Sequence, residues 1–590
     1  MNKVTGWWSK FELRMPFETK TNERVRYFPG IVAIGLCLVL SACTSSHYRK
    51  SADKETYGIL SEDASQVDNV DSDFSIEHEP KIILKNLAKS HQRSDFLGED
   101  GQRLEKGAEV LKMSDSLELA IKHNRNYLTR KETIYLQALE LTLARWDFAP
   151  IFSGDGSLAR GRETSGATGS SSAQLASNIE RGVDNLVATN SFTRQANAGV
   201  SMLQRTGARI AVDFTSDFLR LLGGDRSVNN SKLAVTLAQP LLKGGGYLAT
   251  MENLTQAERE LLYTLRDFAN FRREFIVGVV SDYYNVLRAR DRVMNTWTGY
   301  QGFVKSVERE TALAEEDRRT QTELGLLQQA SLRLEGGWVN ELRSYQQQLD
   351  EFKITLGMPV ESKIVLDVDE LRKLELELPQ LSRSQAVNVA ISARPDLITA
   401  NDRRIDADRK IKVAKVGLRP GLDVVGGYDI NSPSIDGTPK LDFNRKNWNA
   451  GLEVDLPFNR KAERNTYRAA FVALEQSKRN LDLAYDQLRL DIFDDWRALD
   501  QAQRNFAISI SGVNLAQRRL EEQELLGELG GGKARDLVEA QQDLTNSQNQ
   551  RTSAIVDHTL ARLALWQDMG ILYINKDGSW VKKLKTEANE

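Results

Sequence analysis

Residues Ser231–Tyr247, which read SKLAVTLAQPLLKGGGY, decide the fold of this 590-residue chain. Apolar side chains occupy every second position at Leu233, Val235 and Leu237, as in a β-strand with two different faces. Pro240 ends the strand because it has no backbone N–H, and the three glycines that follow allow the chain to turn. Helical periodicity then begins and continues without proline far beyond Tyr247. The stretch therefore predicts a short strand that leads directly into a very long helix.

Composition and charge exclude several classes of function. The chain is 41% hydrophobic and 27% charged, as folded proteins are, and its net charge of -3 gives no reason to expect a nucleic-acid partner. Two cysteines cannot build a disulfide framework, and no pair of the five histidines has metal-ligand spacing on one helix face. A G-x-x-x-x-G-K pattern at 527–533 lacks the Ser or Thr that a phosphate loop needs next. No catalytic cluster is visible, so we expect neither an enzyme nor a cofactor or metal.

The N-terminal region has the pattern of a bacterial lipoprotein signal. The apolar run Ile31–Ala42 is too short to span a bilayer but has the length of the apolar part of a signal peptide. It ends in Leu40-Ser41-Ala42-Cys43, which resembles the bacterial lipobox. We therefore expect residues 1–42 to be the signal peptide and Cys43 to be lipidated. A plain secretory signal and an uncleaved anchor are the alternatives. The long lead before the run indicates that translation starts at Met15 rather than Met1.

Two segments near the ends of the mature chain show no sustained period. Residues 43–113 are polar and acidic in patches, which predicts a flexible, lipid-anchored tether. Residues 573–590 are expected to be a C-terminal tail.

The sequence between these segments repeats one module. Similar features recur at Ala120 and Ala390 and at Pro150 and Pro420, so we expect a first repeat at 114–357, a connecting segment at 358–382 and a second repeat at 383–572. In the first repeat a strand is expected at 151–162, an exposed loop at 163–195, a hairpin at 199–218 and a strand at 231–239. In the second repeat strands are expected at 422–429 and 448–456. Long helical patterns surround the strands in both repeats.

The expected strands have one apolar and one polar face. In the clearest case, Trp448, Ala450, Leu452 and Val454 alternate with Asn449, Gly451, Glu453 and Asp455. Such a strand fits between lipid and a water-filled lumen. A half-buried strand of a soluble sheet shows the same alternation. The secretion signal favours the membrane, so the expected fold is mainly α with a membrane β-barrel part.

Five short stretches, in this order and within a duplicated helix–strand–strand–helix–helix module, carry a resemblance to a known family. They are LARWDFAP (143–150), LAQPLLKGGG (237–246), RPDL (394–397), LPF (456–458) and RDLVEAQQDL (535–544). The chain from about 114 to 572 resembles the TolC-type outer-membrane efflux proteins. The resemblance implies a homotrimer in which each chain gives four strands to a 12-stranded β-barrel, continued by a long periplasmic α-helical barrel.

The resemblance also implies a function and its partners. Proteins of this family are outer-membrane channels of tripartite efflux or type I secretion systems, and they export small molecules or proteins. Energy comes from an inner-membrane pump, to which a periplasmic adaptor (membrane fusion protein) joins the channel. A periplasmic coiled-coil scaffold or adaptor lipoprotein without a pore is the alternative.

The tips of the helix hairpins are the sites that the resemblance assigns. In the second tip, 529–536, Asp536 and Glu539 match the acidic positions that ring the periplasmic aperture, although both could simply be acids favoured by a helix N-terminus. The first tip, 314–322, is highly charged and has Asp317 where the family has glycine. The residues expected at the adaptor-docking tips are Asp317, Arg318, Arg319, Thr322, Gly530, Lys533 and Arg535.

Overall fold

The computed structural model describes residues 44–70, 74–77, 87–91, 94–166, 186–221, 227–315, 320–374, 376, 381–434, 439–529, 532–575 and 580–582. The chain divides into two compact units, 1–57 and 58–590. The described part of the first unit, residues 44–57, contains the beginning of helix α2 (Ser45–Ala64). The second unit contains the sheets and the long helices.

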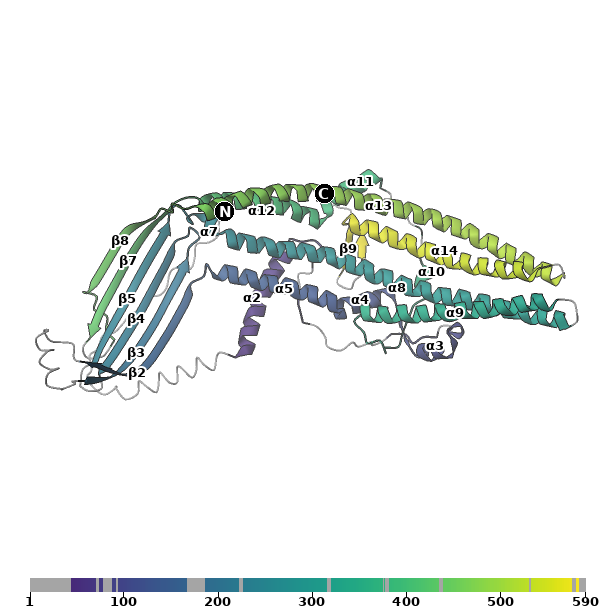
Figure 1. Ribbon diagram of the computed structural model, residues 1–590, viewed down its shortest axis with the longest axis horizontal. Coiled ribbons are helices and arrows are strands. Elements are labelled where there is room, and N and C mark those ends of the chain that lie inside the picture. Colours follow the sequence, from purple (N-terminus) through teal and green to yellow (C-terminus); the bar gives the residue numbers. More distant parts are fainter. Residues whose placement is uncertain are drawn as a thin grey trace, which may run out of the picture. The chain divides into compact units, whose positions relative to one another are not determined.

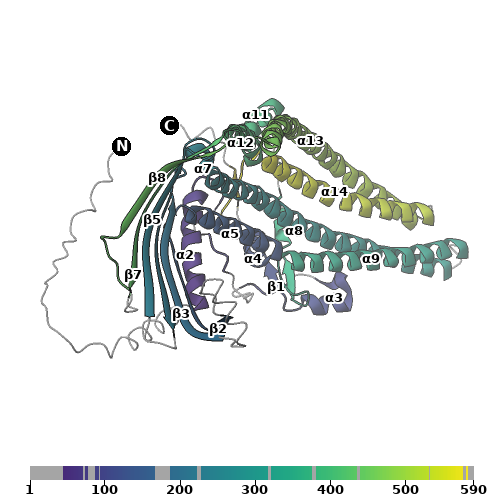
Figure 2. The same ribbon diagram turned by 60° about the vertical axis from the view of Figure 1, so that its left-hand side comes forward.

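The second unit contains both short and very long helices. They are η1 (Asp95–Leu97), α3 (Gly98–Glu105), α4 (Met113–His123), α5 (Arg125–Trp146), α7 (Tyr247–Thr250), α8 (Glu252–Glu315), α9 (Gln321–Thr355), α10 (Asp369–Arg372), α11 (Arg383–Ala393), α12 (Pro395–Gly417), α13 (Lys461–Glu528) and α14 (Ala534–Asp568). Helices α8 and α9 form one hairpin, α13 and α14 form another, and α14 also packs against α8 (Figure 2).

The strands form one large sheet and two small ones. They are β1 (Glu109–Leu111), β2 (Ile151–Gly166), β3 (Leu186–Leu203), β4 (Arg209–Leu221), β5 (Ser227–Pro240), β6 (Ile364–Leu366), β7 (Gly421–Ser434), β8 (Lys446–Asp455), β9 (Leu572–Ile574) and β10 (Trp580–Lys582). In Figure 1 the large sheet lies at one end of the second unit, and the tips of the helix hairpins lie at the other.

The large sheet has six antiparallel strands in the order β2-β3-β4-β5-β7-β8 (Figure 1). The resemblance implied four strands per chain, and for this chain that expectation is wrong. The first repeat supplies four strands because the hairpin β3–β4 is inserted between β2 and β5, whereas the second repeat supplies β7 and β8. The alternating pattern at 199–218 indicates this hairpin. The loop expected at 163–195 is wrong at both ends, because β2 extends to Gly166 and β3 begins at Leu186, while 167–185 lie outside the described residues.

Strand register separates the two faces of the large sheet. One row of directly opposed residues crosses all six strands on the apolar face, and it consists of Phe152, Val200, Val212, Val235, Tyr428 and Trp448. The edge residues of this row, Phe152 and Trp448, are 81% and 73% exposed. The adjacent row lies on the opposite face and includes Asp213 and Asp429. The sheet therefore has an apolar face whose edges no other described part of the chain covers.

The β3–β4 turn is attached to the place where β5 passes into the long helix. The backbone oxygen of Thr206 accepts hydrogen bonds from the Gly246 N–H (3.0 Å) and from the Gln239 amide (3.2 Å). Gly207 has φ +92°, a conformation that favours glycine, and a Cβ there would lie 3.0 Å from the Gly244 oxygen. The glycines after Pro240 thus let the β3–β4 turn lie close against the joint between β5 and α7.

The joint after β5 also binds the joint where α12 passes into β7. The N–H groups of Leu241 and Lys243 donate to the oxygens of Leu422 (2.8 Å) and Pro420 (3.3 Å). The Lys243 ammonium lies 3.1 Å from the carboxylate of Glu463 at the start of α13. We call these four segments, 204–208, 240–247, 418–422 and 457–463, the collar. It connects the β3–β4 turn with the β5–α7, α12–β7 and β8–α13 joints through one set of contacts.

Part of the segment expected to be a tether packs on the long helices. Phe74 is buried and meets the ring of Phe268 edge to face. Arg272 of α8 donates to the backbone oxygens of Asn69 (3.1 Å) and Asn575 (2.9 Å), so it fixes both the N-terminal and the C-terminal segment. Strand β1 pairs with β6 of the connecting segment. Composition misses this order because a few buried apolar residues are spread thinly among many polar ones.

A buried ion pair holds the same N-terminal segment to the middle of the helices. The guanidinium of Arg290 lies 3.1 Å from the carboxylate of Glu105, and both side chains are only 7% exposed. The Tyr345 hydroxyl donates to the other carboxylate oxygen (3.2 Å), and Phe96 lies under the guanidinium. Because the pair is buried, removing one partner leaves an uncompensated charge, which costs about 3–5 kcal/mol.

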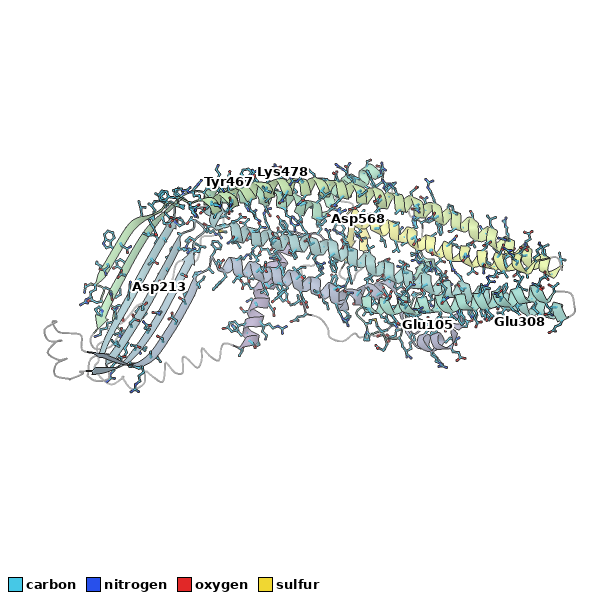
Figure 3. The ribbon with its side chains drawn as sticks, viewed as in Figure 1. Glu105, Asp213, Glu308, Tyr467, Lys478 and Asp568 are labelled. Carbon is cyan, nitrogen blue, oxygen red and sulfur yellow. The ribbon has the colours of Figure 1, made fainter. Side chains whose placement is uncertain are left out.

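A cluster of carboxyl groups joins the end of α14 to α13. Burial, and then the neighbouring groups Asp568, Asp491 and Asp494, raise the pKa of Asp495 to about 7. Burial also raises the pKa of Asp568, which lies at the end of α14 in Figure 3. Arg394 binds Asp491 (3.2 Å) beside them. The pair therefore holds a proton at a pH where an ordinary carboxyl group has lost it.

This carboxyl pair predicts a pH-dependent stability. The folded pKa of Asp495 lies above its unfolded value of about 4, so its stabilising contribution is complete below pH ~4 and is lost as the pH rises to about 7. Thermal unfolding in detergent should show a midpoint that falls over this range, and Asp495→Asn should reduce the fall. Asp500→Asn, which changes an exposed carboxylate of the same helix, serves as the control. An equal fall in the Asp495→Asn variant would contradict the assignment.

The attachment of the β3–β4 turn makes a second prediction. Gly207→Ala places a side chain at positive φ and against Gly244 and Thr250, so it should destabilise the protein by about 1–3 kcal/mol. Gly154→Ala is the control, because its Cβ would meet only the Asn197 oxygen, at 3.9 Å. The measurement is the unfolding midpoint of each purified variant, and equal midpoints would show that the turn is not held tightly.

Candidate functional site

The tips of the two helix hairpins lie side by side. Their facing side chains form one apolar cluster, to which α8 gives Phe303, α9 gives Leu327 and α14 gives Leu537. Gly299 permits this approach, because a Cβ there would lie 2.8 Å from the hydroxyl of Thr545 and 3.0 Å from the amide of Gln541. The space left between the tips is only about 10 Å³, too small for a bound ligand. The tips therefore form one packed surface.

The first tip is described on both sides of its turn. Helix α8 ends at Glu315, and the Thr320 hydroxyl caps α9 by accepting from the Glu323 N–H (3.3 Å). The candidate docking residue Thr322 is exposed in the first turn of α9. The candidates Asp317, Arg318 and Arg319 lie outside the described residues.

The second tip makes a tight return from α13 to α14. The Gly532 N–H donates to the Leu526 oxygen (3.0 Å), and a Cβ on Gly532 would lie 2.8 Å from the backbone nitrogen of Gly527. The candidate docking residues Lys533 and Arg535 are exposed at the start of α14. Gly530 lies outside the described residues.

The two candidate aperture residues lie in the first turns of α14 but differ in their surroundings. Glu539 accepts a hydrogen bond from Arg535 (3.0 Å) and lies 3.6 Å from Arg519 of α13. Asp536 is half-buried, and among the described residues no ion pair includes it. The carboxylate of Asp536 is thus the less neutralised of the two.

Charged residues of the helices near the tips were missed by the sequence analysis. Arg519 pairs with Asp543 as well as with Glu539, and Arg309 of α8 lies 3.7 Å from Glu528 of α13. The first of these partnerships has a signal in the sequence. Opposite charges such as Arg519 and Asp543 lie at nearly equal distances on either side of the turn, as facing positions of a hairpin must. The ion pair of Arg309 and Glu528 has no such signal, because it connects α8 with α13, which belong to different hairpins.

The polar face of the large sheet is a second candidate site. Among the strand residues whose side chains the structure describes, it carries seven acidic residues and two basic ones. The acidic residues are Asp155, Asp213, Asp217, Asp423, Asp429, Glu453 and Asp455, and the basic ones are Arg209 and Lys232. Figure 3 marks Asp213 in the middle of the sheet. This face is therefore hydrated and negative.

The helical part also contains hollows between its helices. One of them, about 810 Å³, is lined mainly by amide and small side chains of α13 and α14, such as Asn505 and Asn549. Within the described ranges, no group of three or more His, Cys, Asp or Glu side chains is placed to hold a metal ion.

In the described part of the chain, none of the helices is both long and apolar enough to cross a membrane.

Comparisons by sequence and by structure give different results. No protein-family model and no curated protein matches the sequence. Solved structures do match the fold. CusC, described in connection with transmembrane channel formation, aligns with a TM-score of 0.57 at 14% identity, over 78% of this chain and 92% of CusC.

Two further matches come from named organisms. The CmeC outer membrane channel of Campylobacter jejuni aligns with a TM-score of 0.55 at 14% identity, over 78% of this chain and 85% of CmeC. The outer membrane protein VceC of Vibrio cholerae gives 0.54 at 14% identity, over 78% and 96%. These likenesses confirm the resemblance predicted from the sequence: the chain has the fold of the TolC-type outer-membrane efflux channels.

Proposed function

We propose that three copies of this chain form the outer-membrane channel of a tripartite efflux or type I secretion system. The channel exports small molecules or proteins from the periplasmic side to the exterior. The observation that carries the proposal is an antiparallel sheet with one apolar and one acidic face, joined through the collar to long helix hairpins. The solved structures with this fold are outer-membrane channels, which supports the same assignment.

The edges of the sheet favour an assembly over a single chain. Strands β2 and β8 each have one side without a neighbouring strand in the sheet order. A bilayer offers no water to unpaired backbone N–H and C=O groups, so such edges must pair with further strands to form a closed barrel. We place the apolar face against lipid and the acidic face in the lumen.

The ends of the apolar face fit this placement. Phe192 and Phe218 lie near its outer end together with Arg194, whose guanidinium stacks on Phe218. Aromatic girdles with basic side chains mark the interfacial region of membrane barrels. From Ile210 to Phe218 the face covers about 27 Å along the strand, close to what a tilted membrane strand needs.

The alternative, a scaffold or adaptor lipoprotein without a pore, is disfavoured by the same face. A soluble scaffold would leave the large exposed side chains of this row, Phe152, Tyr428 and Trp448, in contact with water. We propose a channel, not an enzyme, because the fold matches outer-membrane channels and, among the described residues, no group of three or more His, Cys, Asp or Glu side chains could hold a metal ion.

Anchoring and partners complete the proposal. Cys43 is the proposed lipidation site and holds the mature chain to the outer membrane. The hairpin tips, with Thr322, Lys533 and Arg535 exposed, are the proposed docking surface for a periplasmic adaptor. The adaptor connects the channel to an inner-membrane pump.

The central test is conductance of the full-length protein in planar bilayers. We expect a pore that prefers cations, because acidic residues outnumber basic ones on the lumen face. A salt gradient across the bilayer measures the preference through the reversal potential. Protein that inserts but never conducts would overturn the channel. Release of a Cys43→Ser variant from membranes without detergent would favour the scaffold.

A second prediction concerns the aperture. If three copies of Asp536 ring the opening, divalent cations should block the pore, and Asp536→Asn should raise the half-blocking concentration about three- to tenfold, or ~1 kcal/mol. Glu539→Gln should have a smaller effect, because Arg535 and Arg519 already neutralise Glu539.

The matched control for the aperture is Asp557→Asn, which removes a carboxylate of the same helix that pairs with Arg288. Single-channel recordings with a titrated divalent cation measure all three variants. Unchanged block in Asp536→Asn would refute the residue assignment but not the channel.

A further inference from the structure

The two open edges of the large sheet are complementary. Six strands alternate in direction from β2 to β8, so β2 and β8 run antiparallel to each other. When identical copies are arranged in a ring, β8 of one copy meets β2 of the next in an antiparallel orientation. The edges can therefore pair in the same way as the strands inside the sheet.

The register inside one chain shows how far the strands are displaced from one another. One row of directly opposed residues starts at Ile151, the first residue of β2, and ends at Asn449. Asn449 lies six residues from Asp455, where β8 meets its joint. The row thus begins at the helix end of β2 and reaches β8 six residues away from the helix end of that strand.

We infer that β8 of each copy pairs with β2 of the next at this same displacement and that three copies close an 18-stranded barrel, not a 12-stranded one. The inference rests on the proposed trimeric channel. With the helix ends of all strands at one level, the residue of β2 opposite Asn449 lies six residues inward from Ile151, which is Ser157. The inserted hairpin β3–β4 supplies the six additional strands.

The tilt of the strands supports this closure. Six residues per copy give a total stagger of 18 residues around 18 strands. With a rise of about 3.3 Å per residue and about 4.8 Å between strands, this stagger corresponds to a tilt of about 35°. Membrane barrels tilt their strands by about 35–45°. The six-residue stagger between β2 and β8 of one chain therefore gives the strand tilt that membrane barrels have.

The pairing also suits the side chains at the edge. The same register places Trp448 opposite Leu158 and Leu452 opposite Gly154 of the neighbouring copy. Trp448, Leu452 and Leu158 are 73%, 69% and 71% exposed in the single chain. Large side chains next to a glycine cover the gap that the missing side chain leaves.

A wider membrane pore follows. Barrel diameter grows roughly linearly with strand number, so 18 strands give a barrel about half again as wide as 12. Barrels of 16 to 18 strands enclose an aqueous channel. The membrane part of this channel then accepts bulkier hydrated solutes than a 12-stranded barrel would, and selection by size moves to the helical part.

Cysteine cross-linking of the full-length protein in membranes tests the pairing. The double variant Ser157→Cys/Asn449→Cys places two thiols opposite each other between copies. Within one chain the two positions are more than about 20 Å apart, too far for a disulfide. Oxidation should give cross-linked species of two and three chains on a non-reducing denaturing gel, and none larger. The parent protein without added cysteines should stay monomeric on the same gel.

Two register controls sharpen the test. Ser153→Cys/Asn449→Cys and Ala159→Cys/Asn449→Cys displace the first thiol by four and by two residues. We expect at least about tenfold less cross-linking than in the matched pair. Preferred cross-linking of either control would overturn the six-residue displacement.

The size of the largest species decides the number of strands. Species that end at two chains would mean a barrel of 12 strands and would overturn the inference. Absence of cross-links in all three variants would overturn the edge pairing. Conductance is measured on the same preparation, so that these outcomes can be told apart from failure of the channel itself. A pore that conducts without the predicted disulfides would overturn the edge pairing but leave the proposed function intact.

Discussion

The structure depends on where the unpaired backbone groups at the two edges of its sheet find partners. Inside the sheet every strand from β3 to β7 has two neighbours, and only β2 and β8 do not. In water such an edge is solvated, but in a bilayer each unpaired group costs several kcal/mol. In the proposed channel the apolar face meets lipid, and the edges then need further copies of the chain. On that proposal, oligomerisation is a condition of folding for this part of the molecule.

The helices solve a different problem. The hairpins consist of helices of 35 to 68 residues, and most of the stability of such helices comes from tertiary contacts. At the tips an apolar cluster and close glycine contacts join the two hairpins. In the middle the buried Arg290–Glu105 pair and the docked segment around Asn69 join the helices to both ends of the chain. The helical part therefore has contacts between elements far apart in sequence along much of its length.

Periodicity predicted most of the elements, whereas it could not predict how they pair. The alternation around Leu233 and Val235 identified β5, and the pattern at 199–218 identified the β3–β4 hairpin. The number of strands taken from the family resemblance was wrong, because an insertion of paired strands changes the sheet but not the motifs that carry the resemblance. The packing of Phe74 and Arg272 was also missed, since single buried residues in a polar segment have no period. At the tips, sequence located the candidate acids, but the pairing of Glu539 with Arg519 depends on how two helices face each other.

The collar has a mechanical consequence. Hydrogen bonds connect the turn at Thr206, the joint after Pro240 and the joint between α12 and β7 at Pro420, and Lys243 ties the joint after Pro240 to the start of α13. A torque applied at the hairpin tips therefore reaches the sheet through several parallel connections, and no single joint can act as a free hinge. The collar therefore transmits rotation of the α8–α9 hairpin to the α13–α14 hairpin of the same chain. From these contacts we expect the strands to move together as one frame and bending to occur in the helices beyond the collar.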